Sequence, residues 1–199
     1  MKKGIFLFLL SFTFFVFRAH AQGIHIGLKA GSIGSQITGR AFDGNMQWGF
    51  SGGAFAELNL TGKWGVQGEM LYNQIKSETA DNFEDLYLQG GIPGRSFTLN
   101  YLNIPILLNY QFLPILSLEL GPQFGILLNT SDNITTNGVD PFRKNSFSMA
   151  AGAQVNLMKI KLGARYTYGF TNLCSVSEIN QVDSWKNQTI QFYIGLRIF

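Results

Sequence analysis

The chain has 199 residues, of which 46% are hydrophobic and only 14% are charged, and it contains one cysteine. A single thiol can form neither an internal disulfide nor a multi-cysteine metal site, so we interpret Cys174 as a loop or loop-edge residue. Of the 15 Lys and Arg residues, Lys2, Lys3 and Arg18 lie at the N-terminus, and the remainder has 12 basic and 12 acidic residues. The positive net charge is therefore no argument for nucleic acid as a partner.

The N-terminus has the three parts of a secretory signal peptide. Lys2 and Lys3 precede an uncharged apolar run at residues 4–17, and Ala19-His20-Ala21 matches the small residues of a signal-peptidase site. This run is shorter than the roughly 20 residues that span a bilayer as a helix. We expect residues 1–21 to be a cleaved signal peptide and residues 22–199 to form one mature domain.

Beyond the signal, polar and apolar residues alternate with a period of two, which predicts β-strands with two unlike faces. In the fifth segment Leu116, Leu118 and Leu120 alternate with Ser117 and Glu119. The predicted strands are residues 23–31, 48–60, 64–77, 97–110, 115–129, 146–157, 160–170 and 188–199. Pro105 falls inside the fourth, and because proline has no N–H for the ladder we expect a bulge or an unpaired position there.

The predicted connections alternate between short and long. Short turns are expected at residues 61–63, 111–114 and 158–159, and long polar loops at residues 32–47, 78–96, 130–145 and 171–187. This alternation is typical of outer-membrane barrels, which have short periplasmic turns and longer outside loops.

The polar faces decide between a membrane barrel and a soluble one. An eight-stranded barrel has an interior just wide enough for side chains to fill, and glycines and paired charges fit it. The apolar faces then belong outside, against lipid. We therefore predict an all-β fold, an eight-stranded antiparallel up-and-down transmembrane β-barrel. The residues expected to point inward are Glu57, Gln67, Glu69, Glu119, Gln123, Gln154, Lys161, Arg165 and Arg197.

Several segments resemble the PorT-like outer-membrane β-barrel family, whose members are often named porin family proteins. They are GLKAG at residues 27–31, EMLY at 69–72, YLNIPILL at 101–108, Gly121-Pro122 and residues 152–155. The resemblance implies a barrel in the bacterial outer membrane, surrounded by its lipid and inserted by the barrel-assembly machinery, with no shared reaction. Family chains usually end in an aromatic-x-Phe pattern, whereas here Ile198 and not Phe199 shares the apolar face with Leu196. A bulge or a frayed last residue would reconcile the two.

No catalytic, cofactor or metal site is predicted. Glu69, Glu119, Lys161, Arg165 and Arg197 are expected to form a structural ion cluster in the barrel interior, because pairing offsets the cost of burying charges. A gated ion path is the alternative role for these residues. His25 is the only histidine that remains after cleavage, and no motif marks a catalytic or metal-binding partner for it.

These features favour a non-enzymatic barrel with a structural or interaction role, in which the outside loops form the contact surface for a protein partner. The first alternative is a small porin, which planar-bilayer conductance would detect. A lipid-modifying barrel enzyme is the second, and it would have to use His25. A soluble periplasmic ligand carrier is the third, and it would stay in solution without detergent.

Overall fold

The structure is a computed structural model, and it describes residues 23–38, 46–60, 62–78, 96–131, 145–171 and 186–199. The signal-peptide prediction for residues 1–21 and Cys174 both lie outside the described residues. Within the described residues, no helix is long and apolar enough to cross a membrane.

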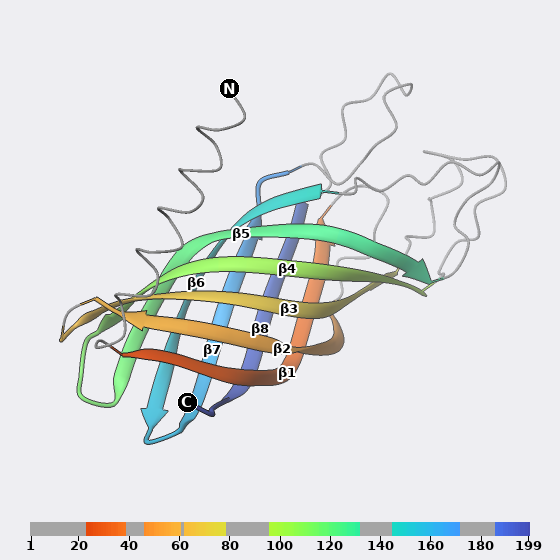
Figure 1. The fold of residues 1–199 in the computed structure, drawn as a ribbon. Helices are drawn as coiled ribbons and strands as arrows, with labels where there is room; N and C mark the ends of the chain where they lie inside the picture. The colour runs from red at the N-terminus through yellow and green to blue at the C-terminus, as the bar shows by residue number, and fades with distance from the viewer. Residues whose placement is uncertain (1–22, 39–45, 61, 79–95, 132–144, 172–185) are drawn as a thin grey trace, which may run out of the picture.

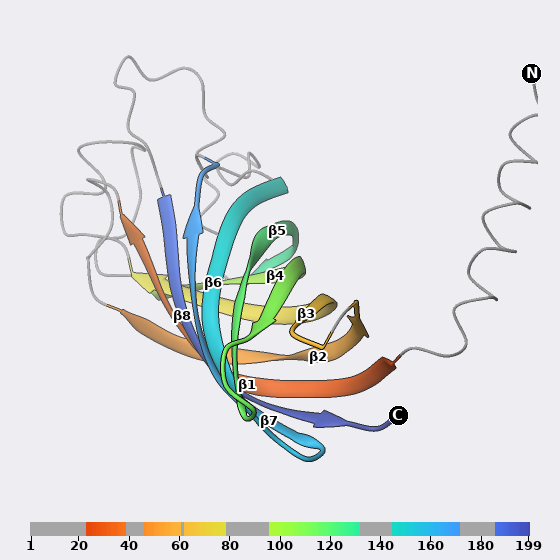
Figure 2. The ribbon, with the colours of Figure 1, turned by 90° about the vertical axis from the view of Figure 1, so that its left-hand side faces the viewer.

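Eight antiparallel strands follow one another around a closed barrel, and β8 pairs back onto β1 (Figure 1). Figure 2 shows the same ring of strands after a quarter turn. The strands are β1 (Ile24–Thr38), β2 (Gln47–Asn59), β3 (Trp64–Glu78), β4 (Ser96–Gln111), β5 (Leu116–Ser131), β6 (Asn145–Leu157), β7 (Ile160–Gly169) and β8 (Lys186–Arg197). The predicted eight-stranded fold is confirmed.

The short connections all lie at one end of the barrel, which we call the turn end. They join β2 to β3, β4 to β5 and β6 to β7, and Figure 1 shows them on the left and lower left. The shortest contains only Met158 and Lys159, and Met158 adopts a φ of 53° there. The long connections, which follow β1, β3, β5 and β7, alternate with these turns, and we call the opposite end the loop end.

Seven predicted strands agree with the structure to within two residues at each boundary, but the first was predicted too short. β1 continues to Thr38 and pairs on both sides, with Ser35 opposite Gln47 and Thr38 opposite Lys186. Sequence reasoning assigned residues 32–38 to a loop because the polar and apolar alternation fades there. The backbone ladder does not depend on that alternation, so the strand extends beyond it.

The two faces of the wall have the orientation that the sequence predicts. Leu118, Leu120 and Leu162 are 44%, 53% and 43% exposed on the outside, whereas Glu119 and Arg165 are only 2% and 1% exposed in the lumen. A barrel with an apolar outer surface and a polar interior is the reverse of a water-soluble domain. The wall is therefore built to be surrounded by an apolar medium.

One part of the lumen is apolar, which the sequence did not indicate. Leu71 on β3 and Leu99 and Leu107 on β4 point inward and are fully buried. β4 has apolar residues on both faces, since Ile106 and Leu108 are exposed on its outer side. These leucines fill the lumen along the β3–β4 wall, as the narrow interior of an eight-stranded barrel requires.

The backbone accommodates Pro105 through an unpaired position. Gly68 pairs with Ile106 and Leu71 with Asn103, and the ladder between these two pairs is interrupted without a change of register. A register shift is also present between β4 and β5, at Asn100 and Tyr101, but its extra residue is Leu128 on β5. Of the two predicted ways to place Pro105, the unpaired position is the one observed.

The last strand ends in a bulge-like pairing. The N–H groups of Ile198 and Phe199 both donate to the carbonyl of Ile26, at 2.8 and 3.2 Å, and the Ile26 N–H donates to the Phe199 carbonyl at 3.1 Å. Two residues facing one is the pattern of a β-bulge. Ile198 and Phe199 are consequently both on the outer surface, which reconciles the terminal Phe with the strand register.

Candidate functional site

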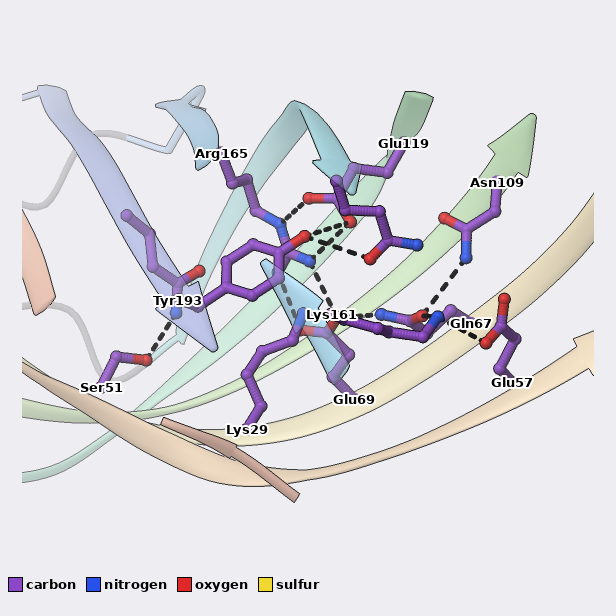
Figure 3. A network of polar contacts seen from close by, with 12 residues as sticks. Lys29, Ser51, Glu57, Gln67, Glu69, Asn109, Glu119, Lys161, Arg165 and Tyr193 are labelled. Atoms are coloured by element: carbon purple, nitrogen blue, oxygen red, sulfur yellow. Dashed lines mark hydrogen bonds and ion pairs between the residues drawn. The ribbon is translucent and has the colours of Figure 1, made fainter. Parts of the chain in front are cut away.

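The lumen is crossed by a network of ion pairs centred on Arg165 of β7 (Figure 3). Its guanidinium binds Glu119 through Nε–Oε1 at 2.7 Å and Nη2–Oε2 at 3.1 Å. It binds Glu69 through Nη1–Oε2 and Nη2–Oε1, both at 2.8 Å. β3 and β7 are four strands apart in a ring of eight, so the pair with Glu69 joins opposite walls of the barrel.

Lys29 and Tyr193 complete this central cluster. The Lys29 ammonium donates to Glu69 Oε1 and lies 3.7 Å from the centroid of the Tyr193 ring. The Tyr193 hydroxyl is 3.1 Å from Glu119 Oε2 and 3.3 Å from Gln154 Oε1. The central cluster, defined as Lys29, Glu69, Glu119, Arg165 and Tyr193, has two cations and two carboxylates, and its charged side chains are fully buried.

A second group of charges lies closer to the turn end. Glu57 Oε2 accepts from Lys161 Nζ at 2.5 Å and from Arg197 Nη2 at 3.3 Å. Gln67 connects the two groups, because its Nε2 donates to Glu69 and its Oε1 accepts from Lys161. This turn-side group, defined as Glu57, Lys161 and Arg197, has two cations for one carboxylate.

Glycines make room for the central cluster. Glu119, Gly152 and Arg165 are successive partners across β5, β6 and β7, so the ion pair passes over a residue that has no side chain. A Cβ on Gly152 would lie 2.6 Å from the Ala164 carbonyl oxygen and 2.7 Å from Glu119 Oε1. The Tyr193 ring similarly covers Gly163, its partner on β7.

The central cluster separates two cavities of very different size. The turn-end cavity has a volume of about 530 Å³, and the loop-end cavity has about 30 Å³. On β3, Gly65 lines the first and Ile75 the second, with Glu69 between them. On β5, Ser117 and Gln123 flank Glu119 in the same way. The ion pairs therefore lie across the middle of the lumen and not at either mouth.

Burying this many charges requires complete pairing. Removing a carboxylate or a guanidinium from water costs several kcal/mol per ion, and only close pairs with additional hydrogen bonds offset that cost. Arg165 meets this requirement, with four contacts to two carboxylates. Such an arrangement holds its side chains in fixed positions, and among the described residues it leaves no unpaired charge in the centre of the lumen.

Aromatic rings on the outer surface gather toward both ends of the wall. At the turn end, the Trp64 and Tyr110 rings are 4.6 Å apart. At the loop end, Phe147 contacts Phe124 at 5.4 Å and Phe170 at 6.2 Å between ring centroids. Girdles of aromatic side chains on either side of an apolar band are typical of barrels that cross an outer membrane.

Residues 19–175 match the family model described as an outer membrane protein beta-barrel domain. The chain belongs to this family. The barrel is therefore located in the bacterial outer membrane, and its apolar outer surface is in contact with membrane lipid. Because outer-membrane barrels direct short turns to the periplasm, we assign the turn end to that side and the loop end to the outside. No curated protein matches the chain significantly.

Solved structures share the same fold. Ail, the attachment invasion locus protein of Yersinia pestis, is similar with a TM-score of 0.50 and 17% identity, over 89% of this chain and 99% of Ail. A second structure of Ail, in complex with the heparin analogue sucrose octasulfate, matches at the same TM-score and identity over 88% and 99%. Neisserial surface protein A has a TM-score of 0.55 and 14% identity, over 89% of this chain and 100% of that protein. At these identities the likeness establishes the fold only.

Within this outer-membrane barrel, the five residues chosen from the sequence occupy two groups. Glu69, Glu119 and Arg165 meet in the central cluster, whereas Lys161 and Arg197 meet at Glu57. Sequence reasoning placed Glu57 on the polar face without assigning it to the ion cluster. It missed Lys29 and Tyr193, although their inward positions follow from alternation with Leu28, Ala30, Phe192 and Ile194.

His25 also lies at the turn end, as the partner of Glu57 across β1 and β2. Its Nδ1 has no hydrogen-bond partner among the described residues. Among all the residues that the structure describes, no group of three or more His, Cys, Asp or Glu side chains could hold a metal ion.

Proposed function

We propose that this protein is a non-enzymatic outer-membrane barrel with a closed lumen, which acts through the surface at its loop end. The observation that carries the proposal is the Arg165–Glu69 pair across the lumen, with both side chains fully buried. A pore requires a continuous aqueous path, and the central cluster occupies the place where that path would run. The ion cluster is accordingly a structural plug in this proposal, and a small porin is the function that it argues against.

The connections at the loop end support an interaction role. Residues 39–46, 79–95, 132–144 and 170–185 are the longest segments between strands, and long outside loops are where such barrels contact partners. These segments contain eight acidic and four basic residues. Their negative balance favours a protein partner with a basic surface over a polyanion of the kind bound in the Ail complex.

Three finer assignments belong to the same proposal. The sequence motifs support a position of the chain among the PorT-like members of the family. Residues 1–21 act as a cleaved signal peptide, so that mature protein isolated from membranes would begin at Gln22. The barrel-assembly machinery inserts the mature chain, and residues 196–199 form the segment that it reads.

Conductance in planar lipid bilayers tests whether the lumen is closed. We expect the wild-type barrel to give no stable steps. Replacing Glu69, Glu119 and Arg165 together with Ala should open a path and give steps. The matched control replaces Met70, Leu120 and Tyr166, the next residues along the same three strands, which face outward. Uniform steps from monodisperse wild-type protein would support the porin alternative instead.

The absence of enzymatic activity has its own test. Purified barrel in lipid should give no specific turnover of phospholipid, lipopolysaccharide or peptide substrates. Turnover that disappears in His25→Ala, with the barrel still folded, would establish the lipid-modifying alternative or a related enzyme.

A further inference from the structure

The turn-end cavity contains polar groups that the barrel itself leaves without partners. Its lining includes Asn109, Asn156 and Arg197, and the exposed residues Gly62 and Lys63 at its rim connect it with the periplasm. Asn109 Oδ1, Asn156 Oδ1 and Arg197 Nε are buried and have no hydrogen-bond partner among the described residues. Buried polar atoms are almost always paired, so three unpaired polar atoms in the residues that line one cavity indicate a binding site for a polar ligand.

The hydrogen bonds that connect Asn109 to the central cluster determine which of its side-chain atoms is left without a partner. A carboxylate only accepts hydrogen bonds, so Gln67 must direct its Nε2 to Glu69. Gln67 Oε1 then accepts from Asn109 Nδ2 at 3.2 Å, and this contact uses the amide nitrogen of Asn109. Asn109 is 4% exposed, and its Oδ1 is left as an acceptor. A ligand group that pairs with this oxygen must therefore be a hydrogen-bond donor.

Asn156 provides a second acceptor, and Arg197 provides a donor. Asn156 Nδ2 donates to Ser117 Oγ at 2.8 Å, which leaves its Oδ1 free. The Arg197 guanidinium makes one contact with Glu57, at 3.3 Å, and its Nε is unpaired. A ligand that satisfies all three atoms must carry donors as well as an acceptor group.

The charge around the cavity favours an anionic acceptor group. Glu57 Oε2 is shared between Lys161 and Arg197, so the turn-side group has one positive charge in excess. Lys63 adds a further cation to the lining. Arg is well suited to bind a carboxylate, because its fork of N–H donors matches the two oxygens.

We propose that the turn-end cavity is a periplasmic binding site for the carboxyl end of a peptide, with Arg197 on the carboxylate and Asn109 and Asn156 accepting from ligand N–H groups. The volume of about 530 Å³ lies within the usual range for small organic ligands. The peptide could be free in the periplasm or be a stem peptide of the cell wall, since both offer a carboxylate beside amide donors. The site lies on the opposite side of the central cluster from the loops, so it is independent of the proposed function.

Isothermal titration calorimetry measures binding to the full mature barrel in lipid nanodiscs. The probes are trialanine, trialanine amide, acetate and a soluble muropeptide with its stem peptide. We expect saturable binding of trialanine or the muropeptide, with weaker binding of the amide and of acetate. The tighter of the two peptides identifies the source.

Two variants and one control test the residues. Arg197→Gln and Asn156→Leu should each weaken binding, the former roughly tenfold or more because it removes a charged hydrogen bond. Lys159→Gln removes a charge at the same end outside the cavity lining and should leave binding unchanged. The proposal is overturned if neither peptide binds, if the amide or acetate binds as tightly, or if Lys159→Gln weakens binding as much as Arg197→Gln. Asn156→Leu decides the matter if Arg197→Gln fails to fold.

Discussion

Arg165 binds Glu69 from the opposite wall of the barrel, with two N–O contacts of 2.8 Å between fully buried groups. The pair connects β7 to β3, which share no backbone hydrogen bonds in the closed order of strands. The pair therefore holds opposite walls of the barrel together, whereas the backbone hydrogen bonds connect only neighbouring strands. In the proposed function the same contact closes the lumen, so Arg165 contributes both to stability and to the closed state.

Removing the Arg165 charge should strongly destabilise the barrel. Arg165→Met leaves Glu69 and Glu119 buried with too little positive charge, and breaking a buried pair in this way costs about 3–5 kcal/mol. Urea unfolding in phospholipid vesicles, followed by tryptophan fluorescence, measures the free energy of unfolding. Combining Arg165→Met with Glu119→Gln should recover much of the loss, because the remaining Lys29–Glu69 pair is then balanced in charge. A single Arg165→Met variant as stable as wild type would contradict the role assigned to the cluster.

The glycine under the Glu119–Arg165 pair should not tolerate a side chain. In Gly152→Ala the new Cβ would approach the Ala164 carbonyl and Glu119 Oε1, and overpacking of this kind costs about 1–3 kcal/mol. Gly68 is the matched control, because a Cβ there would meet nothing within 4 Å. The same urea titration should show a lower midpoint for Gly152→Ala and little change for Gly68→Ala. Equal midpoints for the two variants would argue against close packing of the Glu119–Arg165 pair over Gly152.

The outer face should tolerate large apolar substitutions but not charged ones. Leu120 is 53% exposed on the lipid side of β5, and Arg on the lipid face of a barrel costs up to about 2–4 kcal/mol near the bilayer midplane. Leu120→Arg should lower the free energy of unfolding in vesicles, whereas Leu120→Phe should leave it nearly unchanged. Equal tolerance of both substitutions would mean that this face is not in contact with hydrocarbon.

The strands, their faces and the alternation of turns and loops could be derived from the sequence because these signals are local. Glu119 points inward and Leu120 outward as a direct consequence of the two-residue period of a strand. The end of β1 was missed because Ser32 is exposed and Ile33 buried there, the reverse of the pattern that marks the other strands. Leu99 and Leu107 were not expected inside, because β4 is apolar on both faces and its sequence does not distinguish them.

The sequence by itself determined that the inward-facing charges had to find partners within the barrel, since a buried charge without one is too costly. Only the tertiary structure decided the partners, because they depend on the tilt and stagger with which all eight strands close. The tilt and stagger of the strands bring Arg165 to Glu69 across the lumen and divide the charges into two groups. They also place Asn109 and Arg197 in the lining of the periplasmic cavity.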